Sequence, residues 1–179
     1  MTETLQTLRY PIGELRLPES PISRDTREAM IDTIAGTPAA LRAAVAGLTE
    51  AQLDTPYRPD GWTVRQVVHH VVDSHVNSYC RFKLTITEEH PTIRTYREDL
   101  WGEQADARQA DVEVSLRLLE ALHERWTGWL RTLGDDQWAR TFHHPEMGDL
   151  VLDQLLALYA WHGPHHVAHI AGLREREGW

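Results

Sequence analysis

The chain contains only one cysteine, Cys80, so no disulfide can form within a single molecule. Such sparing use of cysteine is typical of a reducing compartment, and we expect a cytoplasmic location. No apolar run is long enough to span a bilayer, and the opening residues MTETLQTLRY lack the basic, apolar and small-residue order of a signal peptide. Basic residues are outnumbered, 18 against 27 acidic ones, and the net charge of -9 disfavours nucleic acid and anionic membranes as partners.

The apolar pattern predicts one helical domain. A chain of 179 residues with 41% hydrophobic content fits a single unit covering residues 1–179. Residues 1–23 carry three prolines and little apolar periodicity, so we expect an extended N-terminal arm. Four later segments repeat apolar residues at helical spacing, at about 25–48, 63–89, 111–133 and 150–175. Because the polar stretch after residue 90 is too long for a hairpin turn, the fold class is all-α, a four-helix bundle with a long crossover that passes over one end of the bundle.

Two of the predicted helices contain proline, which removes a backbone donor and clashes with the preceding turn. Pro38 predicts a kink or a restart in the first helix. Gly163 and Pro164 predict a bend near Ala160 in the last helix.

The stretch WHGPHHVAHI in the last helix holds four of the 11 histidines. His162 and His166 are four residues apart and share one face of a helix, which is a metal-ligand spacing. Burying two imidazoles in an apolar bundle costs desolvation, whereas a shared metal ion accepts both lone pairs. We therefore favour a metal site over ordinary buried histidines. His165 and His169 have the same spacing but rank second, and we expect His169 to support the ligands from behind.

A second cluster, HHVVDSH, lies in the second predicted helix and can supply a third imidazole. His75 falls on the apolar stripe, His70 on its flank, and His69 on the outer side. The residues alone leave the choice open. Asp73 is a candidate catalytic or supporting carboxylate, which could bind the metal, orient an imidazole or accept a proton, and its alternative is a solvated helix position.

A ligand pocket is also possible where the second helix meets the crossover. Cationic and aromatic side chains there could bind an anionic, partly apolar ligand, and a solvated loop is the equal alternative. The candidate substrate-binding residues are Arg81, Lys83, Arg94, Tyr96, Arg97 and Trp101.

Three motifs resemble those of the YfiT branch of the DinB-like superfamily of four-helix bundles. They are the early YPIGE, the run TPYRPDGWTVRQVVHHVVDSHVNSYCRFKL, and the terminal WHxxHHVAHI followed by a final GW. The resemblance extends from about residue 10 to residue 179. It implies that three histidines, His70, His162 and His166, bind one divalent metal ion, Zn²⁺ or Ni²⁺. It also implies a homodimer. The Gly163-Pro164 pair departs from the family pattern and puts the geometry of the last helix in question.

The resemblance implies a metal-dependent enzyme. The expected activity is a thiol S-transferase that conjugates a low-molecular-weight thiol such as bacillithiol to an electrophilic small molecule. A metal-dependent hydrolase that uses metal-bound hydroxide is the first alternative, because sequence spacing does not separate the two reactions. A non-catalytic, metal-responsive bundle is the second.

Overall fold

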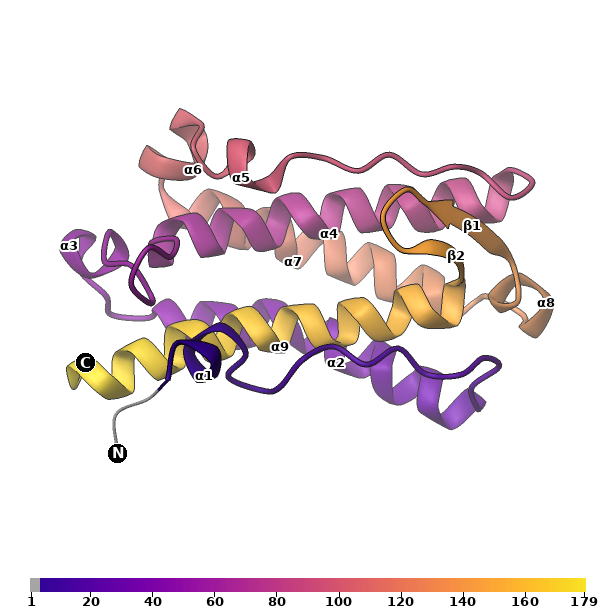
Figure 1. Ribbon diagram of the computed structural model, residues 1–179, viewed down its shortest axis with the longest axis horizontal. Coiled ribbons are helices and arrows are strands. Elements are labelled where there is room, and N and C mark those ends of the chain that lie inside the picture. The colour runs from indigo at the N-terminus through magenta and orange to yellow at the C-terminus, as the bar shows by residue number, and fades with distance from the viewer. Residues whose placement is uncertain (1–3) are drawn as a thin grey trace.

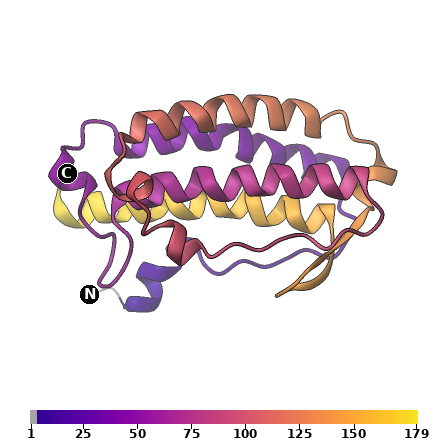
Figure 2. The ribbon, with the colours of Figure 1, turned by 90° about the horizontal axis from the view of Figure 1, so that it is seen from above.

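Four long helices dominate the computed structural model, which describes residues 4–179 (Figures 1 and 2). These helices are α2 (Arg24–Val45), α4 (Val64–Thr87), α7 (Val112–Leu130) and α9 (Leu152–Glu177). The predicted four-helix bundle is confirmed. Within residues 4–179, no helix is long and apolar enough to cross a membrane.

The helices are connected in an order that makes two neighbouring pairs parallel, α2 with α9 and α4 with α7, and the other two pairs antiparallel. Helix α2 packs against α7 and α9, and α4 packs against the same two helices, so α2 and α4 occupy opposite corners. Figure 1 shows α4 and α7 running in one direction and α2 and α9 in the other. The crossover from α4 to α7 therefore returns along the length of α4. The expectation that it passes over one end of the bundle is wrong. It carries two short helices, α5 (Glu98–Trp101) and α6 (Ala105–Gln109).

Side-chain caps begin the helices that the sequence predicts. Thr63 caps α4 through a capping box: its hydroxyl accepts a hydrogen bond from the Gln66 backbone N–H at 3.2 Å, and the Gln66 side-chain oxygen accepts from the Thr63 N–H at 3.0 Å. Asp111 caps α7 by accepting from the Glu113 N–H at 2.9 Å. Local signals therefore set the start of α4 close to its histidines.

The N-terminal arm is largely extended, as expected, except for a five-residue helix, α1 (Leu5–Arg9), that we did not predict. The first three residues of the arm lie outside the described residues. A buried carboxylate holds the arm's far end. Asp153 of α9 accepts hydrogen bonds from the Ser20 hydroxyl and the Ile22 N–H, both at 3.0 Å, and from Arg27 Nε of α2 at 2.7 Å.

A β-hairpin that the helical pattern did not predict lies between the third and fourth long helices. Strand β1 (Thr141–His144) pairs antiparallel with β2 (Gly148–Val151), between the short helix α8 (Asp135–Trp138) and α9. Phe142 and Leu150 face each other across the hairpin, and both are buried. Packing these two side chains on the end of the bundle stabilises strands that are too short to stand alone.

Proline does not divide α2 or α9, and each is assigned as one helix. The bend expected near Ala160 stays a prediction. Gly163 has a clear packing role: a Cβ atom there would lie 2.5 Å from the Thr37 hydroxyl of α2. A side chain would have to push the helices apart, so glycine is needed for the close approach of α9 to α2.

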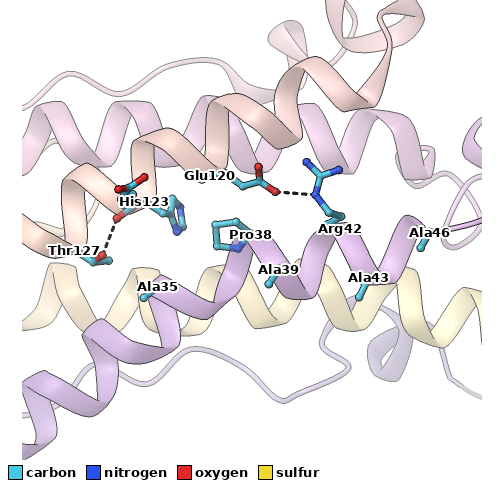
Figure 3. Close-up of a pocket in the computed structure, with 10 residues that line it drawn as sticks. Ala35, Pro38, Ala39, Arg42, Ala43, Ala46, Glu120, His123 and Thr127 are labelled. Carbon is cyan, nitrogen blue, oxygen red and sulfur yellow. Dashed lines mark hydrogen bonds and ion pairs between the residues drawn. The ribbon is translucent and has the colours of Figure 1, made fainter.

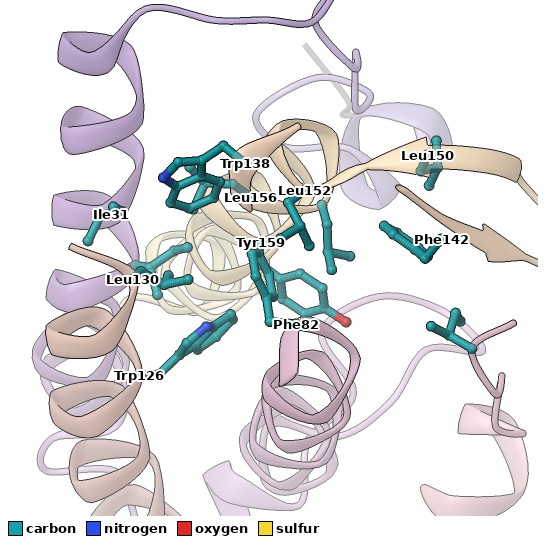
Figure 4. Close-up of a cluster of buried hydrophobic side chains, with 13 residues drawn as sticks. Ile31, Phe82, Trp126, Leu130, Trp138, Phe142, Leu150, Leu152, Leu156 and Tyr159 are labelled. Carbon is teal, nitrogen blue, oxygen red and sulfur yellow. The ribbon is translucent and has the colours of Figure 1, made fainter. Parts of the chain in front are cut away.

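The apolar core consists of two clusters at opposite ends of the bundle. One cluster, centred on Trp126, Tyr159 and Phe82, fills the end beside the hairpin (Figure 4). The other is rich in valine from the start of α4. Between the two clusters, each of the four long helices contributes one polar side chain. This polar layer consists of Thr37, His75, His123 and His162.

Candidate metal centre

Three histidines from two helices converge beside the polar layer. His70 comes from α4, and His162 and His166 come from successive turns of α9. One ring nitrogen from each can be chosen so that all three lie within 4.8 Å of one another. The ring centroids are 5.3 Å apart for His70 and His162, 4.8 Å for His70 and His166, and 4.5 Å for His162 and His166. The structure thus brings together the three predicted ligands.

These imidazoles are neutral at pH 7. Burial, reinforced by the neighbouring imidazoles, holds the pKa values of His70 and His166 well below the ordinary value. Burial lowers the pKa of His162 to about 4. Neutral imidazoles offer lone pairs without first losing a proton. Three such donors suit a divalent ion such as Zn²⁺ or Ni²⁺ and leave coordination positions for a substrate.

A cavity of 390 Å³ opens onto the three histidines. Its walls come from α4, the crossover, the hairpin and α9. The lining residues outside the three histidines include Trp62, Arg81, Tyr96, His144 and Trp161. The cluster therefore has access to a small molecule.

Arg81 places an unpaired positive charge in this cavity. Its side chain is buried, with 8% of the residue exposed. One terminal nitrogen donates to the Arg94 carbonyl oxygen at 3.1 Å, the other approaches the Tyr159 hydroxyl at 3.5 Å, and Nε has no partner. Among residues 4–179, no carboxylate forms an ion pair with it. Since a buried unpaired charge is costly, the arrangement is typical of a site that receives an anionic group.

The family is shown by comparison with known proteins. A model of the DinB superfamily matches residues 33–170. The chain belongs to the DinB superfamily. It is 51% identical over 177 residues to "Putative metal-dependent hydrolase YfiT" of Bacillus subtilis (strain 168), covering 98% of this chain and 99% of the relative. It is 50% identical over 175 residues to a Bacillus cereus (strain 03BB102) protein named "Putative metal-dependent hydrolase", covering 98% and 100%.

A solved structure also matches closely. The structure of YfiT from Bacillus subtilis, described as a "probable metal-dependent hydrolase with an unusual four-helix bundle topology", has a TM-score of 0.94 and 52% identity. The match covers 97% of this chain and 99% of that one. The resemblance that the motifs indicated is therefore confirmed, in both family and fold.

The cationic candidates of this DinB-superfamily chain divide between two cavities. Arg81 and Tyr96 line the cavity of the three histidines. Arg94, Arg97 and Trp101 line an adjoining cavity of 560 Å³ that also includes Tyr96. Lys83 lies in neither cavity, because its ammonium group stacks 3.6 Å over the Trp129 ring.

Asp73 does not line the cavity of the three histidines. Burial, with the nearby charge of Asp106, raises its pKa to about 6. Asp73 is half-buried on α4, one turn beyond His70. Its proposed role in catalysis stays a prediction.

The prediction that His69 points outward is wrong. The crossover and α7 cover that face of α4, through Ala110 and Ser115. His69 is buried, and its ring nitrogens lie 2.8 Å from the Ser115 hydroxyl and 3.3 Å from the Ala110 carbonyl oxygen. These contacts give it a structural role away from the three-histidine cluster.

The rival pair in α9 has other partners. The His165 ring stacks on Trp161 at 4.1 Å. His169 stacks on Tyr57 at 4.0 Å, and its Nε2 donates to the Arg9 carbonyl oxygen at 3.0 Å. No hydrogen bond links His169 to the ligand set within the described part of the chain, so the support expected from it is limited to ring packing against His166 at 5.4 Å.

Sequence reasoning missed two histidines that the fold brings near the site. His144 of β1 lines the cavity, and it lies outside the predicted helices. His123 of α7 is buried in the polar layer. Its inward position was readable from its spacing, since it lies four residues after Leu119 and three before Trp126.

Proposed function

We propose that this chain is a metal-dependent thiol S-transferase, which conjugates a low-molecular-weight thiol such as bacillithiol to an electrophilic small molecule. One Zn²⁺ or Ni²⁺ per chain is held by His70, His162 and His166. The observation that carries the proposal is the shared cavity, in which three neutral imidazoles and one unpaired guanidinium face the same space.

The reaction requires an activated sulfur and a fixed substrate. A divalent metal held by three imidazoles lowers the pKa of a thiol that binds it, so that the thiolate is available at neutral pH. The sulfur lone pair then forms a carbon–sulfur bond, while the leaving group departs with its bonding electrons and the thiol proton passes to solvent. The task of the protein side chains is to hold the thiol and the electrophile in line.

Arg81 supplies the second anchor for the thiol. Low-molecular-weight thiols of this class carry carboxylates, and a planar guanidinium binds a carboxylate through paired hydrogen bonds. The anion would also satisfy the buried Nε, which has no partner within the described structure. Docking the carboxylate at Arg81 positions the sulfur at the histidine cluster, so remote binding energy serves the reacting centre.

Replacing Arg81 by Gln should weaken binding of the thiol more than it slows the chemical step. A charge-assisted hydrogen bond is worth about 2 kcal/mol, so we expect the KM for a carboxylate-bearing thiol to rise about 30-fold. The kcat should change much less, the pattern of lost uniform binding. Steady-state conjugation assays with the metal-loaded protein measure both constants.

Lys83→Gln is the matched control, because Lys83 lies two residues away on α4 but outside the cavity. It should leave the thiol KM unchanged. Arg97→Gln should have a smaller effect than Arg81→Gln, since Arg97 lines only the adjoining cavity and already pairs with Asp99. Equal effects of the Lys83 and Arg81 variants would contradict the anchoring role.

Hydrolysis is the second candidate, and the names of the relatives favour it. It needs the same histidines but no thiol. Turnover of an ester or amide without a thiol, together with no conjugation for several carboxylate-bearing thiols, would replace the transferase by the hydrolase. Thiol-dependent alkylation with negligible ester turnover would support the transferase.

We further propose that the protein is a homodimer. Val114 and Leu118, on adjacent turns of α7, leave 55% and 50% of their surface exposed, so this face has apolar area available for a second copy. Light scattering should report twice the 20.6 kDa mass of the chain. A mass of one chain over the whole range of working concentrations would contradict this proposal.

A further inference from the structure

Three imidazoles form a continuous hydrogen-bonded series that starts at the three-histidine cluster. His162 Nδ1 lies 3.1 Å from His75 Nε2. On the other side of that ring, His75 Nδ1 lies 2.8 Å from His123 Nε2. The series ends where His123 Nδ1 lies 2.7 Å from the Ile34 carbonyl oxygen of α2. It therefore crosses the bundle from α9 through α4 and α7 to α2.

The carbonyl at the end of the series sets the direction of every hydrogen bond. A carbonyl oxygen can only accept, so His123 must carry its proton on Nδ1. The Nε2 atom of a neutral His123 then accepts from His75 Nδ1. By the same reasoning, His75 Nε2 accepts from His162 Nδ1. The free lone pair of His162 is consequently left on Nε2.

Their surroundings keep the hydrogen-bonded imidazoles neutral. His75 and His123 are almost fully buried, and no carboxylate within residues 4–179 forms a hydrogen bond or ion pair with either ring. The rings that contact His75 are those of His123, whose plane is nearly parallel with its centroid 4.9 Å away, and of Trp126, Tyr159 and His162. Burial also lowers the pKa of His123 to about 4. In the neutral arrangement every ring proton in the series already has an acceptor, namely His75 Nε2, His123 Nε2 and the Ile34 carbonyl oxygen.

The far end of the series reaches a separate groove. His123 lies on the wall of a 510 Å³ groove between α2 and α7, beside Pro38 and the Arg42–Glu120 ion pair (Figure 3). His123 has apolar and charged neighbours in the groove, but its Nδ1 donates a hydrogen bond to the Ile34 carbonyl oxygen in the backbone of α2. A backbone oxygen inside a helix is held in place, so the hydrogen-bonded imidazoles fix the ring of His162 on α9 relative to the backbone of α2.

We propose that His75 and His123 are positioning residues, which hold His162 in the tautomer and ring orientation that present Nε2 to the metal. The inference rests on His162 being a ligand in the proposed function. A partner on the non-ligating nitrogen of a metal-binding imidazole commonly changes metal affinity by about 10- to 100-fold. Here that partner is a neutral imidazole, itself oriented by a third.

The first test is spectroscopic and uses the metal-free wild-type protein. Nitrogen-15 NMR of the histidine rings should find the proton on Nδ1 in His75, His123 and His162. In the His75→Phe variant, His162 should lose this fixed tautomer and populate the Nε2–H form. A wild-type His162 with its proton on Nε2 would overturn the proposal, whatever the variants do.

The second test measures metal affinity by competition with a chelator. His75→Phe should weaken binding about 10- to 100-fold, and His123→Phe should weaken it less, because His123 acts through His75. His69→Phe is the control: it removes another buried histidine of α4 that lies outside the series, and the affinity should not change. Unchanged affinity in both the His75 and His123 variants would overturn the proposal. Failure to transfer a thiol, with these tautomer and affinity results intact, would overturn the proposed reaction alone.

Discussion

Replacing His162 and His166 together by Ala should reduce bound divalent metal to background. Sites with four protein ligands bind zinc with about 10–16 kcal/mol, so one imidazole is worth about 3 kcal/mol, a factor of roughly 100 in affinity. Each single change, His70→Ala included, should therefore weaken binding sharply. Elemental analysis of purified protein and chelator competition measure the two quantities.

Two neighbouring histidines serve as controls. His69→Ala should retain metal, because His69 bonds to Ser115 and the Ala110 carbonyl rather than to the cluster. His165→Ala should also retain it. If His165→Ala lost as much metal as His166→Ala, the site would belong to the rival pair. Stoichiometric metal in the double variant would contradict the assignment of the metal to these three histidines.

Replacing Asp153 by Ala should destabilise the fold by about 3–5 kcal/mol, because the buried guanidinium of Arg27 would lose its buried partner and keep only the exposed carboxylate of Asp135. The carboxylate is also the acceptor for the Ser20 hydroxyl and the Ile22 N–H, so the arm loses its attachment to α9. For a chain of this size the expected fall in Tm is about 10 °C. Urea unfolding monitored by circular dichroism gives the free energy directly.

Asp135→Ala is the matched control for this prediction. Asp135 also pairs with Arg27, at 2.6 Å, but its side chain is 92% exposed, against 1% for Asp153. An exposed ion pair contributes about 0–1 kcal/mol, so the variant should unfold almost like the wild type. A similar loss of unfolding free energy in the Asp135 and Asp153 variants would contradict the conclusion that the burial of Asp153 is what stabilises the fold.

The helical part of the fold and the His162–His166 pair could be predicted because both depend on local spacing, whereas the choice of His70 came from the family resemblance. The capping box at Thr63 and the separation of His162 from His166 are written within a few residues. Features that depend on partners distant in sequence could not be predicted this way. Residues after α6 cover His69, and the hairpin is held by the burial of Phe142 against the bundle.

The residues that line the cavity could not be predicted from the sequence for the same reason. Composition marked Arg81, Lys83, Arg94 and Arg97 as equivalent cations, but only the path of the crossover decides which of them faces the histidines. The hydrogen-bonded imidazoles were equally hidden, since the series joins residues from four helices. Sequence periodicity places a side chain on an inner face, but it does not show which inner faces meet.

The packing of the first long helix against the last has a consequence for how the protein folds. The most extensive helix packing joins α2 to α9, the first and last long helices, rather than successive ones. Contacts between such distant segments raise the contact order, and folding slows as loop closure must precede the contacts. On the ribosome, α2 cannot pack against its partner before α9 has been synthesised. Two of the three proposed metal ligands, His162 and His166, lie in α9, so the proposed site can form only after this helix has packed.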